Sequence, residues 1–179
     1  MIPFLILVLA LGMMDGFELS LPTARFIATG IFVLAAATDW LDGYLARKLN
    51  QTTDFGKFMD PLADKILVMS AMVYMVVLGD IGPWVLILIE SREFIIAGVR
   101  MVAANKNIVI AAGLWGKLKT IAQMVMIPVV LLNVQHPYFA TAFHIAGQVL
   151  IYASVALTII SAADYIWHNR AVFKEEAKV

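Results

Sequence analysis

The chain has 179 residues, of which 62% are hydrophobic and only 15% are charged, and its formal net charge is zero. A mean hydropathy of +0.88 is too high for an ordinary soluble domain, and the balanced charge excludes a general attraction to nucleic acid. The absence of cysteine excludes disulfides and thiolate chemistry. We therefore expect an all-α integral membrane protein, with residues 1–179 forming a single membrane domain.

Six apolar segments follow one another along the chain, and a membrane-spanning helix needs about 20 mostly apolar residues. The first is the short apolar start, residues 1–11, which we expect to continue through Met14 as a helix. It lacks a basic start and a small-residue cleavage site, so a signal peptide is disfavoured. The other five segments are 22–46, 55–78, 82–104, 114–134 and 141–167. Together they predict a bundle of six transmembrane helices.

Lys and Arg residues cluster after the second, fourth and sixth segments, whereas the connections 12–21, 79–83 and 133–141 contain none. The clustered cations are Arg47, Lys48, Lys57, Arg100, Lys106, Lys117, Lys119, Arg170, Lys174 and Lys178. By the positive-inside rule these three ends face the cytoplasm. We therefore expect a multi-pass protein of the cell (inner) membrane with both termini in the cytoplasm.

Four aspartates lie at the predicted cytoplasmic mouth, where the second helix ends and the third begins: Asp39, Asp42, Asp60 and Asp64. Their spacings of three and four residues place each pair on one helix face. An ionised aspartate inside a membrane helix costs about 2.5–3.5 kcal/mol, and four carboxylates repel one another. One or two divalent cations, Mg²⁺ or Mn²⁺, would offset both costs. Paired metals can also stabilise the attacking and leaving oxygens of a displacement at phosphorus.

Small residues and one arginine accompany the aspartates. Gly43, Ala46 and Gly56 lack bulk and would let helices or a nucleotide approach closely, and the fork of Arg47 suits a phosphate. Taken singly, the glycines are more often packing residues and Arg47 a positive-inside anchor. Eight specified residues at fixed spacing make coincidence negligible.

The string D-x-x-D-G-x-x-A-R, eight further residues, and G-x-x-x-D-x-x-x-D is similar to the full hallmark of the CDP-alcohol phosphatidyltransferase family, with no departure at its eight positions. The resemblance implies a six-helix enzyme, commonly a homodimer, that moves a phosphatidyl group from CDP-diacylglycerol to an alcohol and releases CMP. It further implies that the four aspartates hold two divalent metals and that Asp64 is also the base for the acceptor hydroxyl. The residues it implies for CDP-diacylglycerol binding are Asp42, Gly43, Ala46, Arg47 and Gly56.

Four further cations suggest which alcohol is used. Arg92 and Arg100 are eight residues apart in the fourth segment, and Lys117 and Lys119 begin the fifth. We interpret them as an anion pocket beside the metals, suited to an acceptor that carries a phosphate. The alternative is a set of internal ion pairs with neighbouring glutamates, combined with positive-inside anchors.

The surrounding strings Arg92-Glu93-Phe94, Gly98-Val99-Arg100 and 115–120 resemble the phosphatidylglycerolphosphate synthase branch of the family, which implies sn-glycerol 3-phosphate as the acceptor. Members of that branch usually begin with an Asn-x-x-Thr-x-x-Arg stretch on an interfacial helix. This chain starts at Met1-Ile2-Pro3, so we expect that segment to be truncated or absent.

Two groups of alternatives stay open at this point. Within the same reaction class, the acceptor could be inositol phosphate, inositol or serine. From another class, intramembrane carboxylates could belong to an ion or proton transporter. Transporters commonly show internal repeats and sites near the middle of the membrane, whereas these carboxylates lie towards one mouth and no repeat is visible.

Overall fold

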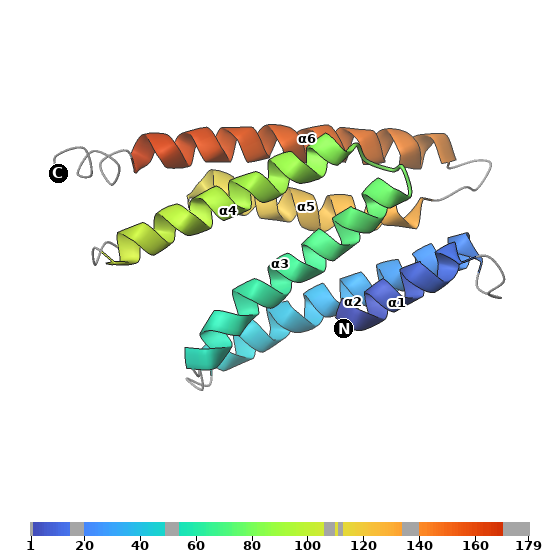
Figure 1. Cartoon of the computed structure of the whole chain (residues 1–179), viewed down its shortest axis with the longest axis horizontal. Coiled ribbons are helices and arrows are strands. Elements are labelled where there is room, and N and C mark those ends of the chain that lie inside the picture. Colours follow the sequence, from blue (N-terminus) through green and yellow to red (C-terminus); the bar gives the residue numbers. More distant parts are fainter. Residues whose placement is uncertain are drawn as a thin grey trace.

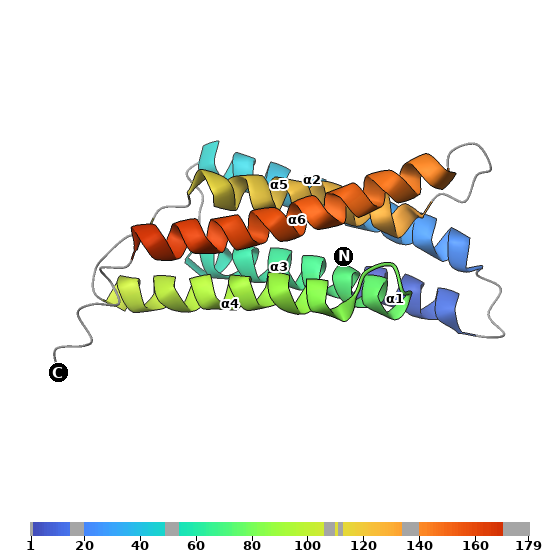
Figure 2. The same ribbon diagram turned by 90° about the horizontal axis from the view of Figure 1, so that it is seen from above.

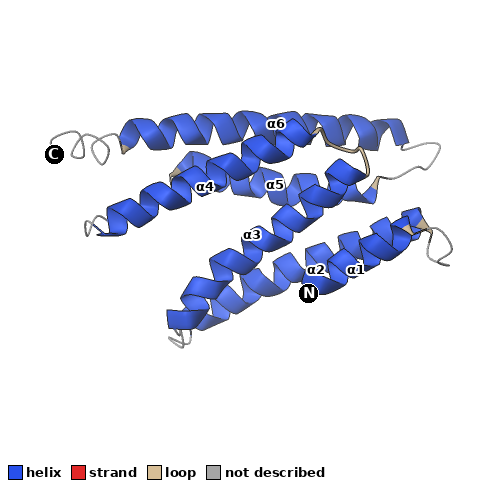
Figure 3. Cartoon of the chain, viewed as in Figure 1, coloured by secondary structure: helices blue, strands red, loops and turns tan. Residues whose placement is uncertain are grey.

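The computed structural model describes residues 2–14, 20–48, 54–105, 110, 113–133 and 140–169. Within the helices, the side chains of residues 2, 40, 43, 44, 46, 47, 54–61 and 105 lie outside this description. The described part is helical, without strands (Figure 3). Its helices are α1 (Ile2–Met13), α2 (Leu21–Lys48), α3 (Asp54–Val77), α4 (Pro83–Asn105), α5 (Leu114–Leu132) and α6 (Ala140–His168). The predicted all-α class is confirmed. The bounds of each predicted segment differ from those of the observed helix by about two residues or fewer, which is the uncertainty expected at helix ends.

The helices pack into one bundle around a shared apolar core. The most extensive helix–helix contacts join α5 to α6 and α1 to α2, while α3 touches α1, α2, α4 and α5 (Figures 1 and 2). Each helix contributes side chains to this core. Fully or almost fully buried examples, taken from α1 to α5 in order, are Leu5, Phe32, Met72, Ile89 and Met126. The bundle thereby fixes where the polar ends of α2, α3 and α4 lie.

The outside of the bundle is apolar as well. Phe26, Ile87, Phe94, Ile121 and Tyr152 are each at least 60% exposed. Exposed apolar area on this scale marks a surface that meets lipid or another apolar partner rather than water. By length and composition, the segments Leu21–Asp39, Leu114–Leu132 and Ala140–His168 can each cross a membrane. The chain is therefore a membrane protein, and three of its described helices are long and apolar enough to cross a membrane.

The turn between α3 and α4 is closed by a glycine. Gly79 has a positive φ of 77°, a conformation that glycine adopts without steric cost. Its N–H donates to the carbonyl of Val76, and the N–H of Asp80 donates to the carbonyl of Met75 at 2.8 Å. These are the two hydrogen bonds of a Schellman motif, which satisfy the last carbonyls of α3.

The same turn is tied to α2 by a buried ion pair. Nη2 of Arg25 donates to Oδ1 of Asp80 at 3.1 Å, and Nη1 lies 2.9 Å from Oδ2 as an ion pair without hydrogen-bond geometry. Both side chains are nearly buried, at 8% and 12% exposed. Burial raises the pKa of Asp80, although the hydrogen bond and charge of Arg25 act in the opposite direction. Since desolvation dominates, the pair fixes the position of the turn rather than adding large net stability.

We predict that Asp80→Ala lowers the free energy of unfolding in detergent by about 3–5 kcal/mol, because it leaves the Arg25 guanidinium buried without a counter-charge. Denaturant titration of the purified protein measures this loss. The double variant Arg25→Met/Asp80→Ala removes the stranded charge and should recover at least half of it. A double variant no more stable than Asp80→Ala would contradict the assignment.

Candidate functional site

The first element of the site is a cavity of about 200 Å³ between α2 and α3, lined by three of the predicted aspartates. Asp39 and Asp42 come from α2 and Asp64 from α3, and the small side chains of Ala35 and Ala63 leave room between the helices. The two helices run antiparallel and meet at their connected ends (Figure 1). The two acidic pairs, 18 or more residues apart in sequence, thus belong to one end of the bundle.

The donor chemistry of this cavity fits a divalent metal. Three carboxylates supply the hard oxygen ligands that Mg²⁺ and Mn²⁺ take. Among the residues whose side chains are described, no three acidic or histidine groups are close enough together to form a complete metal site. The fourth member of the predicted set, Asp60, lies one helical turn before Asp64 on α3, and its side chain is outside the described part. The same holds for Gly43, Ala46, Arg47 and Gly56.

A second cavity, of about 120 Å³, lies on the other side of Asp64. Its central group is the Glu93 carboxylate of α4. Oε1 of Glu93 accepts hydrogen bonds from Nζ of Lys119 at 2.6 Å and from Nη1 of Arg92 at 2.8 Å. Oε2 lies 3.8 Å from Nζ of Lys65 on α3. One carboxylate therefore joins cations from α3, α4 and α5, and it is the hydrogen-bonded counter-charge of Lys119, which is only 3% exposed.

A third cavity, of about 380 Å³, opens between α4, α5 and α6. Arg92, Arg100 and Lys117 all line it, so the structure brings three of the four predicted acceptor cations to one space. A Cβ built on Gly116 would lie 3.5 Å from Nη2 of Arg92, so the backbone of α5 approaches this guanidinium closely. Lys119 does not line this cavity and points to Glu93 instead.

Helix α6 supplies lining residues that sequence reasoning missed: Ser161, Asp164 and Tyr165. The sequence contains a signal for them, because Asp164 and Tyr165 follow Ser161 by three and four residues and such positions share one face of a helix. From its composition, however, this segment is predicted only as an apolar span. Tyr165 also packs its ring under Arg100, with the guanidinium carbon 5.8 Å from the ring centroid.

The three cavities are linked by shared walls. Asp64 borders the first and second cavities, and Glu93 and Thr120 border the second and third. The predicted aspartates therefore lie at one end of the series, and Arg100 and Lys117 lie at the other, where Asp164 also lines the cavity. Glu93 lies between the two ends. Such an arrangement offers carboxylate oxygens to a cation at one end and cationic side chains to an anion at the other.

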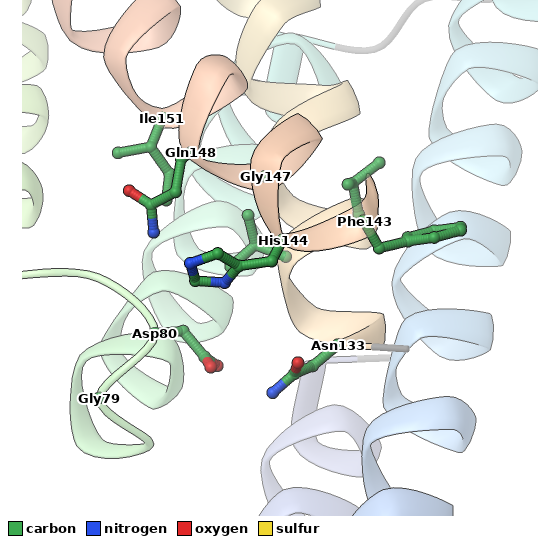
Figure 4. A pocket seen from close by; sticks show the side chains of 10 residues that line it. Gly79, Asp80, Asn133, Phe143, His144, Gly147, Gln148 and Ile151 are labelled. Atoms are coloured by element: carbon green, nitrogen blue, oxygen red, sulfur yellow. The ribbon is translucent and has the colours of Figure 1, made fainter. Parts of the chain in front are cut away.

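A separate polar cavity of about 220 Å³ lies at the other end of α3. Asp80, Asn133, His144 and Gln148 project towards it (Figure 4). None of the predicted site residues belongs to it, and it lies beside the turn that Arg25 secures. It is distinct from the acidic and cationic cavities described above.

The chain is similar to one protein family over most of its length and to several known proteins. The family model described as CDP-alcohol phosphatidyltransferase matches residues 1–160. The chain is 40% identical over 174 residues to a Bacillus subtilis protein named CDP-diacylglycerol–glycerol-3-phosphate 3-phosphatidyltransferase, covering 96% of this chain and 89% of that protein. A Haemophilus influenzae protein with the same name is 40% identical over 156 residues, 84% of this chain and 81% of its own length. A rice protein named cardiolipin synthase (CMP-forming) is 37% identical over 170 residues, 86% of this chain and 51% of its own length.

We predict that Glu93→Ala lowers the free energy of unfolding in detergent by about 3–5 kcal/mol, because the buried Lys119 and the nearly buried Arg92 both lose the carboxylate that accepts their hydrogen bonds. Lys65→Ala is the matched control within the same network. Its side chain is 42% exposed and its nitrogen lies 3.8 Å from Glu93, so its loss should cost no more than about 1 kcal/mol. Equal losses for the two variants would show that Glu93 does not hold the network together.

Proposed function

Because the chain belongs to the CDP-alcohol phosphatidyltransferase family and is therefore an enzyme of phosphatidyl transfer, we propose that its acceptor is sn-glycerol 3-phosphate. The products would be phosphatidylglycerol phosphate and CMP. The names of the two bacterial relatives support this acceptor. The single structural observation in its favour is the cavity lined by Arg92, Arg100 and Lys117 together with Glu93 and Asp164. Arg92 is paired with Glu93, so Arg100 and Lys117 are the cations best placed to bind an alcohol that carries a phosphate.

In this proposal the aspartates form the metal and base end of the site. Asp39, Asp42, Asp60 and Asp64 would hold two divalent cations, Mg²⁺ or Mn²⁺, which when bound neutralise the pyrophosphate and the developing charge on CMP. Asp64 takes up the proton of the acceptor hydroxyl. Its position suits this role, because it borders both the acidic cavity and the cavity that leads to the cations.

The bond changes balance in one displacement. The acceptor oxygen attacks the phosphorus that carries the diacylglycerol, the bond from that phosphorus to CMP breaks, and the hydroxyl proton goes to Asp64. By the resemblance of this sequence to the family hallmark, we infer that CDP-diacylglycerol is bound by Asp42, Gly43, Ala46, Arg47 and Gly56. Holding both substrates in line supplies much of the acceleration.

The alternative acceptors differ in whether they carry a phosphate. Inositol phosphate would satisfy a cationic cavity equally, whereas serine and free inositol carry no phosphate to bind there. A relative of comparable similarity, from rice, is named a cardiolipin synthase (CMP-forming) rather than a glycerol-3-phosphate 3-phosphatidyltransferase. The ion-transporter alternative is set aside by the family to which the chain belongs.

We further propose that all six helices cross or enter the cell (inner) membrane as one domain, with the aspartates and both termini on the cytoplasmic side and with a homodimer as the working form. The clustering of Lys and Arg at one set of helix ends supports this orientation. A cytoplasmic site would meet glycerol 3-phosphate from solution and CDP-diacylglycerol from the inner leaflet.

We predict that the purified protein releases CMP from CDP-diacylglycerol only with both a divalent cation and glycerol 3-phosphate, and that Asp64→Asn lowers turnover at least about a hundredfold, because a general base is lost. Radiolabelled CMP release measures both, with each candidate alcohol supplied in turn. An unchanged melting temperature of the variant in detergent controls for misfolding. Activity of Asp64→Asn within tenfold of the wild type would contradict the assigned role, and a preference for another alcohol would replace the acceptor.

The orientation can be tested with single cysteines, since the chain has none of its own. Ala104 is exposed at the end of α4 and Asn133 is exposed after α5. In intact cells, we expect a membrane-impermeant maleimide to label Asn133→Cys but to label Ala104→Cys only after permeabilisation. Labelling of Ala104→Cys from outside would invert the topology and the substrate access proposed with it.

A further inference from the structure

Two buried polar atoms, both on residues that line the cationic cavity, have no hydrogen-bond partner in the described part of the chain. They are the hydroxyl of Tyr165 and Nε of Arg92. Tyr165 is only 6% exposed. Buried polar groups are almost always paired, because an unpaired one loses its hydrogen bonds to water without replacement. An unpaired donor at the wall of a cavity therefore points to a ligand that completes it.

The position of the Tyr165 ring is fixed by its neighbours. It packs against Ile96 and Val99 of α4, and the Arg100 guanidinium lies over its face at 5.8 Å. The hydroxyl is therefore held in place before any ligand arrives, which lowers the entropy lost on binding.

The other polar side chains that α6 contributes to the cavity already have partners. The Ser161 hydroxyl donates to the Thr158 carbonyl at 3.0 Å, and Oδ1 of Asp164 lies 3.1 Å from Nδ1 of His168. The Asp164 carboxylate would repel an anion placed beside it but can accept a hydrogen bond from an alcohol. Among these three residues, Tyr165 alone is left with an unused donor.

We propose that the Tyr165 hydroxyl donates a hydrogen bond to the phosphate of the acceptor and thereby helps select a phosphorylated alcohol. The inference rests on the proposed function, which places the acceptor in this cavity. Arg92, Arg100 and Lys117 supply the charge that attracts the phosphate, and Tyr165 supplies a fixed neutral donor that sets its orientation. Tyr165 thus acts in acceptor binding and not in the displacement itself.

The test is Tyr165→Phe, which keeps the ring, its packing and its contact with Arg100 and removes only the hydroxyl. A hydrogen bond to a charged group corresponds to about a tenfold or larger change in affinity. We therefore expect KM for glycerol 3-phosphate to rise about tenfold or more, while KM for CDP-diacylglycerol and kcat stay within about twofold. Tyr152→Phe, on the same helix but 61% exposed, should change none of these values. An unchanged KM for glycerol 3-phosphate, or a parallel rise in both KM values, would overturn the inference.

A binding measurement without CDP-diacylglycerol separates this inference from the proposed function. Because the hydroxyl has no partner among the residues that the structure describes, Tyr165→Phe should melt at or above the wild-type temperature but should lose most of the thermal stabilisation that added glycerol 3-phosphate gives the wild type. A lower melting temperature in the free variant would make the hydroxyl a structural group and overturn the inference. If the wild type is stabilised by glycerol 3-phosphate but releases no CMP with it, the proposed function fails and the binding role stands. If the wild type turns over and the two proteins are stabilised equally, the binding role fails and the function stands.

Discussion

A charge buried among apolar helices must find an opposite charge, and this constraint organises the whole bundle. At one end, the Glu93 carboxylate accepts hydrogen bonds from Lys119 and Arg92 and so joins α4 to α5. At the other end, Arg25 of α2 pairs with Asp80 in the turn between α3 and α4. Removing one partner of a buried pair costs far more than replacing both. The two pairs therefore fix relative helix positions that apolar packing alone, which is not directional, would leave free to slide.

The same constraint separates the two kinds of charge in the candidate site. Asp39, Asp42 and Asp64 line a cavity that no cation of α4 or α5 lines, and Arg92, Arg100 and Lys117 line another, together with Glu93 and Asp164. Glu93 lies between them and neutralises Lys119, which would otherwise be positioned to compete with a metal for Asp64. In the proposed reaction, carboxylate oxygens are thus concentrated at one end of the site and cationic groups at the other, so the two substrates have chemically distinct places.

Much of this arrangement could be predicted from the sequence, because the apolar runs are long and are separated by polar turns. The helices and the aspartate pairs follow from such local spacing. The positions of the four cations do not follow from local spacing in the same way. Lys117 and Lys119 are two residues apart, which is about 200° around a helix, so only one of them can line the cationic cavity. The pairing of Arg25 with Asp80 spans 55 residues, and no local pattern indicates it. Tyr165 was missed because its role depends on α4 packing against its ring.

The clamped turn between α3 and α4 has a mechanical consequence. From this turn the two helices diverge, so that the start of α3 and the end of α4 lie apart (Figure 1). With a rise of 1.5 Å per residue, α4 is a lever about 35 Å long, and a rotation of 1° at the turn moves its far end by about 0.6 Å. Displacements of about 1 Å are enough to slow an enzymatic reaction a hundredfold. The Gly79 backbone and the Arg25–Asp80 pair lie far from the candidate site. They nevertheless determine how the site residues of α3 and α4 are positioned relative to one another at the opposite end of these helices.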